Sequence, residues 1–171
     1  MTIAINRGRR AAVSSFATAL LASASFIALG TSSAQAATCS ATSQLTYDNC
    51  MASAAAGDTV LISGTSVVQN VSPTNAITIQ VSSTGVLGDG AATFGAGTTR
   101  LVIDAGGAVS TLAVDTFASL SGAGTLTTPS LSAVVFGDAT NASFSGTWSA
   151  PDLNTALVKQ GTGTLTINGM Q

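Results

Sequence analysis

A six-residue motif that occurs twice constrains the fold more than any other feature of the sequence. The stretches 122–127 and 161–166 both read G-x-G-T-L-T. Glycine permits the positive φ angles of tight turns. The alternation of Thr with Leu or Ile in residues 164–167 is typical of a strand with one apolar face. The repeat therefore predicts an all-β chain in which strand-and-turn units recur.

Strand-like segments alternate with turn residues throughout the second half of the chain. They include residues 76–81, 100–104, 109–114 and 117–120, and Gly, Pro, Asp or Asn separates many of them. The spacing indicates roughly five or six coils of about 20–25 residues each, which is the range of solenoid repeats. In such a solenoid, parallel strands stack coil on coil and bury alternate side chains.

The composition agrees with a stacked β structure. Charged residues make up 7% of the chain, whereas soluble domains usually have about a quarter. Gly, Ala, Ser and Thr dominate, and their small side chains suit a narrow interior with many turns. The regular placement of Val, Ile, Leu and Phe argues against a disordered chain.

The C-terminal copy of the motif belongs to a longer pattern. Residues 157–169 resemble the autotransporter-associated β-strand repeat of bacterial passenger domains, and a Phe-Ser-Gly segment at residues 144–146 resembles the lead-in to that repeat. The resemblance implies that residues 144–169 form one repeat of a passenger domain. The matching residues are Leu157, Lys159, Gly161, Gly163, Thr164, Leu165, Ile167 and Gly169.

A second resemblance lies near the start of the predicted solenoid. A short alanine-rich segment is followed by Ala-Gly-Asp-Thr-Val-Leu-Ile at residues 56–62. This order resembles the opening of right-handed parallel β-helices of the pectate-lyase type, in which a helix covers the first coil. The resemblance implies an all-β, right-handed parallel β-helix over residues 58–171 with a short N-terminal capping helix.

Residues 1–36 have the organisation of a secretory signal peptide. A positive region with three arginines precedes an apolar region, and small residues lie at the cleavage positions. We expect cleavage after Ala36, or as a second choice after Ala37, and export by the general secretory (Sec) machinery. A membrane anchor fits less well because the apolar run is short, and Arg9-Arg10 lacks the rest of a twin-arginine pattern. No stable membrane span is expected in the mature chain.

Residues 38–57 form a separate segment that contains both cysteines. Cys39 and Cys50 lie close together in the sequence, and a disulfide is the default state of such a pair after export. The bond would stabilise the fold by about 2–3 kcal/mol. Residues 45–56 are predicted to form a helix that begins near Thr46 or Asp48 and ends at Gly57.

The chain has no His and no Glu, so a nucleophile–histidine pair cannot be built. Asp58 and Asp115 are interpreted as turn and strand-end residues. Asp104 is placed in a turn, because one carboxylate is too few for a calcium site. Arg100, Asp104 and Lys159 are the one set that could imitate a polysaccharide lyase site. We expect no enzyme activity, metal or cofactor.

Two further groups of residues have structural interpretations. The Gly161–Gly163 turn lacks the helix and acidic partner of a nucleotide site, and Lys159 is expected to be solvated on a strand. Five aromatic residues are predicted to stack in the core, with Trp148 as the alternative candidate for sugar binding. These residues are Phe94, Phe117, Phe136, Phe144 and Trp148.

The charge balance restricts the partners. A chain cut after Ala36 keeps Arg100 and Lys159 against seven aspartates, a side-chain net charge of −5. Binding to nucleic acids or to anionic membranes requires clustered Lys and Arg, so we expect neither.

The resemblance to autotransporters implies a non-enzymatic passenger that acts in adhesion or aggregation at the cell surface. In that family a C-terminal barrel in the outer membrane follows the passenger. We expect none in this sequence, which suggests a truncated product that is periplasmic or secreted by itself. An open β-edge at the last strand predicts self-association. The alternatives are a small secreted β-helix that binds or cleaves polysaccharide, and a surface-layer or fimbrial protein with an antiparallel sandwich.

Overall fold

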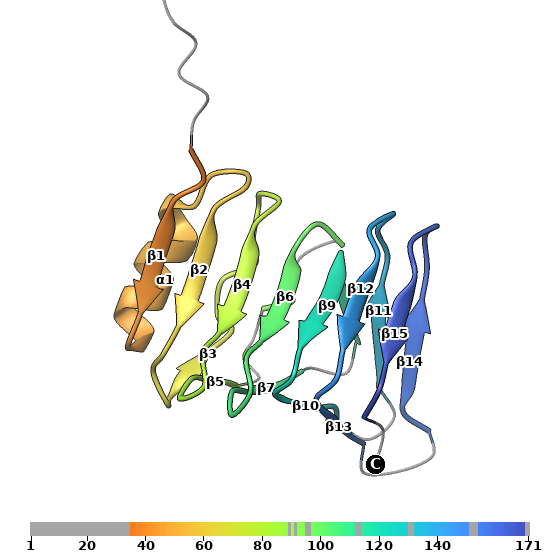
Figure 1. Ribbon diagram of the computed structural model, residues 1–171. Coiled ribbons are helices and arrows are strands. Elements are labelled where there is room, and N and C mark those ends of the chain that lie inside the picture. Colours follow the sequence, from red (N-terminus) through yellow and green to blue (C-terminus); the bar gives the residue numbers. More distant parts are fainter. Residues whose placement is uncertain are drawn as a thin grey trace, which may run out of the picture. The chain divides into compact units, whose positions relative to one another are not determined.

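The computed structural model describes residues 35–88, 90, 92–94, 97–111, 114–129, 132–150 and 154–169. All but the end of the predicted signal peptide lies outside these residues, so it stays a prediction. In the described part, three parallel sheets stack coil on coil, and one short helix lies at the N-terminal end (Figure 1). The predicted fold class, an all-β parallel β-helix with a short capping helix, is confirmed.

Sheet A is the longest of the three and contains one strand from every coil. Residues at matching positions, such as Val60, Ile79, Leu101 and Leu120, pair from one strand to the next, and their spacing agrees with the predicted coil length. The order across the sheet is β1 (Thr38–Ala41), β2 (Thr59–Ile62), β4 (Thr78–Val81), β6 (Arg100–Ile103), β9 (Ser119–Gly122), β12 (Ala142–Phe144) and β15 (Leu165–Ile167).

Sheets B and C complete the coils. Sheet B follows sheet A in five coils, and sheet C has a strand only in the coils that begin with β6, β9 and β12. Sheet B contains β3 (Val67–Val68), β5 (Val86–Gly88), β7 (Ala108–Ser110), β10 (Thr125–Thr127) and β13 (Thr147–Ser149). Sheet C contains β8 (Val114–Phe117), β11 (Ala133–Phe136) and β14 (Ala156–Lys159).

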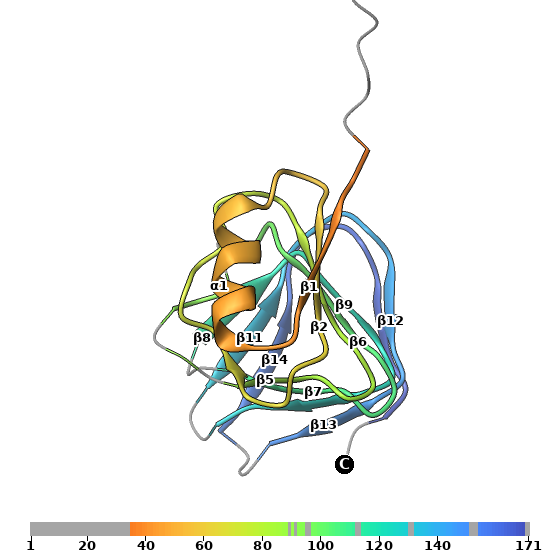
Figure 2. The same cartoon turned by 90° about the vertical axis from the view of Figure 1, so that its left-hand side faces the viewer.

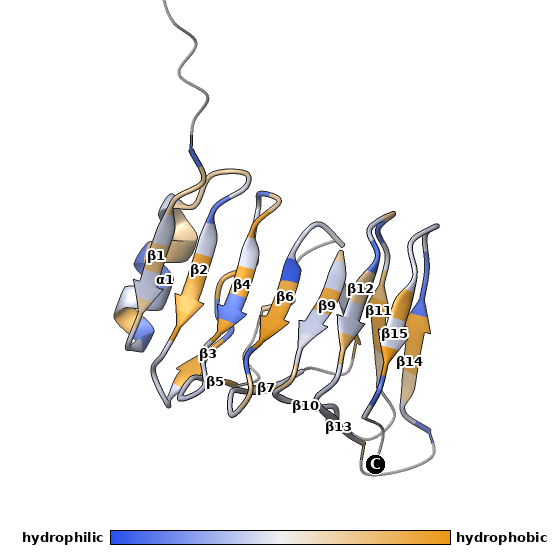
Figure 3. Ribbon diagram, in the orientation of Figure 1, coloured by the Kyte–Doolittle hydropathy of each residue, from blue (hydrophilic) through white to orange (hydrophobic). Residues whose placement is uncertain are grey.

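The core consists of rows of apolar side chains at matching positions of successive coils. Val60, Ile79, Leu101 and Leu120 form one such row, and each is almost fully buried. Buried and more exposed residues alternate along most strands, and apolar positions recur from strand to strand across sheet A (Figure 3). Because successive side chains of a strand point to opposite faces, this alternation places one set inside every coil.

Phenylalanines form a second row beneath sheet C. The ring centroids of Phe94 and Phe117 lie 4.9 Å apart, and those of Phe117 and Phe136 lie 5.7 Å apart. All three side chains are buried, and so is Phe144 in sheet A. Trp148 is partly buried at the end of the interior row of sheet B and packs against the core. The predicted aromatic core is confirmed for the four phenylalanines, and Trp148 lies at its margin.

Helix α1 (Gln44–Ser53) covers the end of the first coil (Figure 2). It buries Tyr47, Cys50 and Met51 against the core. The helix begins earlier than predicted because Ser43 is its N-cap, and the Ser43 side chain accepts a hydrogen bond from the N–H of Thr46. It also ends before Gly57, since the backbone is already extended at Ala54.

Gln44 also closes the first edge of sheet B. Its side-chain amide accepts a hydrogen bond from the N–H of Val68 at 2.8 Å and donates one to the carbonyl of Val68 at 3.1 Å. A neighbouring strand would satisfy the same two backbone groups. The amide of Gln44 therefore takes the place of a strand beside β3.

Candidate functional site

The corners between sheet C and sheet A differ sharply in length. Ala118 alone joins β8 to β9, whereas residues 137–141 join β11 to β12 and residues 160–164 join β14 to β15. The corner above β9 is consequently lower than the corners on either side (Figure 1). A hollow that Ala118 helps to line lies along these corners, and we call it the corner notch.

The corner notch has a volume of about 390 Å³. Small residues of several coils form most of its wall, so backbone and short side chains face the space. The residues that line it are Gly57, Ala76, Ile77, Thr78, Gly97, Thr98, Arg100, Ala118 and Asp138.

Arg100 and Lys159 come to the same row of corners although they lie far apart in the sequence. Arg100 is exposed and lines the notch, and Lys159 lines an adjoining small cavity that shares Ala118 and Asp138 with it. Asp104, the third residue of the predicted lyase-like set, lies beyond the opposite end of β6 and accepts a hydrogen bond from Gln80. The structure thus brings two members of this set to one row of corners, with only Arg100 in the notch itself, and separates the third.

Asp138 lies between the two cations and was not recognised in the sequence. Its carboxylate accepts hydrogen bonds from the backbone N–H and the hydroxyl of Thr140. Its backbone carbonyl accepts a hydrogen bond from Nζ of Lys159 at 3.3 Å. The Asp-x-Thr spacing of this turn was the available signal. Together these groups offer charge and hydrogen bonds to a small polar ligand.

The two G-x-G-T-L-T copies occupy different corners of the coil. Gly161 and Gly163 precede β15 at a corner between sheets C and A, whereas Gly122 and Gly124 precede β10 at a corner between sheets A and B. The copies are therefore not equivalent positions of one repeat, and the interval between them is not the period of the coil. They look alike because both corners use a glycine with positive φ, 108° at Gly122 and 70° at Gly161, before a short strand.

A column of glycines that sequence reasoning missed runs along the corners between sheets A and B. In four successive coils, the residue after the glycine donates its N–H to the carbonyl of the glycine one coil earlier, at 2.9–3.0 Å. A Cβ on each of these glycines would come too close to backbone of the preceding coil. The available signal was a glycine that returns once in every coil at a similar interval. The column consists of Gly64, Gly85, Gly107, Gly124, Gly146 and Gly169.

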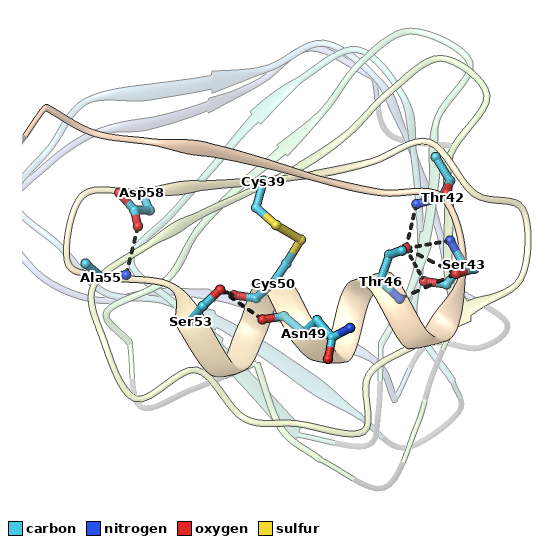
Figure 4. The surroundings of a disulfide bond; sticks show 9 residues. All are labelled: Cys39, Thr42, Ser43, Thr46, Asn49, Cys50, Ser53, Ala55 and Asp58. Atoms are coloured by element: carbon cyan, nitrogen blue, oxygen red, sulfur yellow. Dashed lines mark hydrogen bonds between the residues drawn. A yellow bond between two sulfur atoms is a disulfide. The ribbon is translucent and has the colours of Figure 1, made fainter.

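The predicted disulfide between Cys39 and Cys50 is confirmed, and it ties β1 to α1 (Figure 4). Asp58 follows the helix at the turn into β2, as predicted. One carboxylate oxygen accepts a hydrogen bond from the N–H of Ala55 at 2.8 Å, and the other accepts one from the N–H of Ala37 at 2.8 Å. The hydrogen bonds from Ala37 and Ala55 hold the pKa of Asp58 below its ordinary value.

Two polar groups are buried in the interior, and one of them differs from the sequence interpretation. Asp115 is the second residue of β8 and is fully buried, where a turn or strand-end position was expected; its carboxylate accepts a hydrogen bond from the N–H of Phe94 at 3.3 Å. The hydroxyl of Tyr47 bonds to Gln69, which is also fully buried. Burial raises the pKa of Tyr47 far above its ordinary value, because the charged phenolate would be poorly solvated.

Comparison with known proteins gives no relative from which a function could be transferred. The chain has no match among protein-family models, curated proteins or solved structures. Within the described residues, no helix has the length and apolar character that a membrane crossing requires.

Proposed function

We propose that this chain is an exported, non-enzymatic scaffold of the autotransporter passenger type, which acts in adhesion or aggregation. The observation that supports the proposal best is the parallel β-solenoid, whose N-terminal helix is tied down by the Cys39–Cys50 disulfide. Disulfides persist in oxidising compartments outside the cytoplasm. A solenoid also presents long, regular surfaces on which contacts with other molecules can be arranged.

The residues of the passenger-type repeat have structural roles in this solenoid. Gly161 takes a φ of 70° at the corner before β15, Leu165 and Ile167 occupy interior positions, and Gly169 continues the glycine column. The resemblance thus rests on residues that a stacked coil needs. The resemblance supports the choice of family in the proposal, but it does not indicate a ligand.

Fractionation of a Gram-negative host that produces the full chain with a C-terminal tag tests the export step. We expect a shortened, oxidised chain in the periplasm or the medium. A matched chain in which Arg7, Arg9 and Arg10 are replaced by Asp should stay unprocessed in the cytosol. Recovery of the unchanged chain at its full length in the cytosol would contradict the proposal.

Display of residues 37–171 on an outer-membrane anchor tests the adhesive role. We expect cells that display the chain to settle or attach faster than cells that display the anchor alone. Equal settling and attachment of the two strains would contradict the proposed adhesive role of the solenoid.

A second candidate function is the binding of an acidic polysaccharide in the corner notch. The convergence of Arg100 and Lys159 on this row of corners favours it. Carboxylates of the glycan would pair with the two cations, and we expect Arg100→Gln with Lys159→Gln to abolish retention on an acidic glycan column. Trp148→Ala should retain binding, because Trp148 does not line the notch. Failure of the unchanged chain to bind any acidic glycan would exclude this candidate.

A further inference from the structure

A hydrogen bond joins the predicted cleavage site to Asp58 at the turn into β2. The export proposal does not explain this bond. We infer that signal-peptide removal occurs after Ala36 and that the new α-ammonium group of Ala37 binds the carboxylate of Asp58, fastening the N-terminus to the capped end of the solenoid. The inference rests on the export proposed above and adds a specific site of maturation to it.

The geometry is already in place in the unprocessed chain. The backbone nitrogen of Ala37 lies 2.8 Å from Oδ1 of Asp58, and the carbonyl of Ala37 accepts a hydrogen bond from the N–H of Thr59 at 2.8 Å. Cleavage after Ala36 would convert that same nitrogen from an amide into an ammonium group. The existing hydrogen bond already has a charged acceptor, and after cleavage it would join an ammonium cation to the carboxylate anion.

The carboxylate of Asp58 is oriented so that it can bind a cation at Ala37. Its second oxygen is fixed by the N–H of Ala55, so the group is oriented toward Ala37 through Oδ1. No Lys or Arg occurs between Arg10 and Arg100 in the sequence. The α-ammonium group would thus supply a cation that this stretch of the chain otherwise lacks.

The same contacts distinguish the two predicted cleavage positions. A cut after Ala37 would remove the nitrogen that donates to Asp58 and the carbonyl that accepts from Thr59. A cut after Ala36 keeps both, and residues 35 and 36 are exposed and carry no strand. The structure therefore favours Ala37 as the first residue of the mature protein.

Mass spectrometry of the exported chain gives the first test and needs no variant. We expect a first residue of Ala37. A mature chain that begins at Thr38 or at any other residue would overturn the inference. A chain that stays unprocessed in the cytosol would contradict the export proposal itself, so the two failures are distinguishable.

The second test measures how reactive the α-amino group is. Lys159 is the only lysine of the chain, so an amine-specific ester can label two amines, and peptide mapping separates them. We expect Asp58→Asn to raise labelling of Ala37 severalfold at neutral pH, because an ammonium group paired with a carboxylate loses its proton less readily. Labelling of Lys159 should not change.

Asp104→Asn is the matched control, since it removes one carboxylate that bonds to Gln80 and has no contact with Ala37. It should leave both labelling rates at the values of the unchanged chain. Circular dichroism should confirm that each variant is folded. Equal labelling of Ala37 in the unchanged chain and in folded Asp58→Asn would overturn the inference, even if the first residue is Ala37.

Discussion

Single glycines set how closely the coils can stack. At the corners between sheets A and B, each glycine of the column lies against backbone of the coil before it. Strands of one sheet lie about 4.7–4.9 Å apart, and a side chain at these corners would intrude into that spacing. Glycine is thus required here by space, in addition to the positive φ that Gly122 and Gly161 take at their corners.

Replacement of Gly146 by Ala tests this requirement. The new Cβ would overlap the carbonyl of Gly124, so we expect a loss of about 1–3 kcal/mol in the free energy of unfolding, as overpacking usually costs. Gly137→Ala is the matched control. Its Cβ would have no neighbour closer than the Phe117 carbonyl oxygen at 3.9 Å, and its φ is not positive. Urea denaturation should separate the two variants, and equal midpoints would show that the column has no steric role.

Tyr47 offers a test of the buried polar interior. Burial raises its pKa far above the ordinary value of about 10, so the folded state disfavours the phenolate. The stability that this contributes is complete below about pH 10 and is lost as the pH rises further, because the unfolded chain ionises first. The chain has a single tyrosine, so ultraviolet absorbance follows Tyr47 alone. We expect phenolate to form only together with unfolding, and ionisation at the ordinary pKa in the folded chain would contradict this.

The role of a residue could be predicted from the sequence only where it did not depend on residues of a neighbouring coil. Cys39 and Cys50 were the only candidates for a disulfide, and the turn at Asp58 followed from its neighbours. Asp115 and Asp138 were missed because their roles depend on the coil next to them. An aspartate in a β pattern is normally assigned to a turn, and nothing local shows that Phe94 donates a hydrogen bond to Asp115.

Among the elements, the capping helix α1 has the role of covering the N-terminal end of the solenoid. The end of a solenoid exposes both an apolar interior and unpaired strand edges. Helix α1 covers the interior with Tyr47 and its buried neighbours, Gln44 satisfies β3, and the disulfide fixes the helix to β1. One short helix thus covers the interior and satisfies the edge of sheet B at this end.

Removal of the disulfide tests how much the bond contributes to the stability of this end. We expect Cys39→Ala with Cys50→Ala to lower the free energy of unfolding by about 2–3 kcal/mol, because the bond restricts the unfolded chain. The unchanged chain, reduced and alkylated while unfolded, should lose a similar amount. Unfolding curves that coincide with that of the oxidised chain would mean that α1 stays in place without the bond.

Strands were predictable as a class but less so at their bounds. Residues 117–120 were expected to form one strand, whereas Ala118 divides them between β8 and β9. A corner made of one alanine carries no Gly or Pro to mark it. The corner notch could not be predicted either, since residues of several coils line it.

At the scale of the whole molecule, the two ends of the described solenoid are unlike. β13, β14 and β15 each pair on one side only. Trp148, Leu157, Leu165 and Ile167 are partly buried there, whereas most members of the same rows one coil earlier are fully buried. The N-terminal end carries α1, in which Leu45 is the single exposed large apolar residue.

We expect the chain from residue 37 onward to self-associate through β13–β15. Sedimentation over a concentration series should show the association, and dilution should shift the fluorescence of Trp148, the only tryptophan. Ile167→Lys should abolish it by placing a charge in the interior row. Thr166→Lys, exposed on the same strand, and Leu45→Lys on α1 should not. A stable monomer at every concentration, or loss of association in Leu45→Lys, would contradict this prediction.

The amide of Gln44 has a consequence for the order of assembly. Each coil of this solenoid bonds through its strands and its glycine corner to the coil before it. The coil of β2 and β3 has no full coil before it, and β1, Gln44 and α1 take that place. A chain that crosses a membrane with its N-terminus leading delivers this coil first, so the solenoid can build itself in the direction of its own transport.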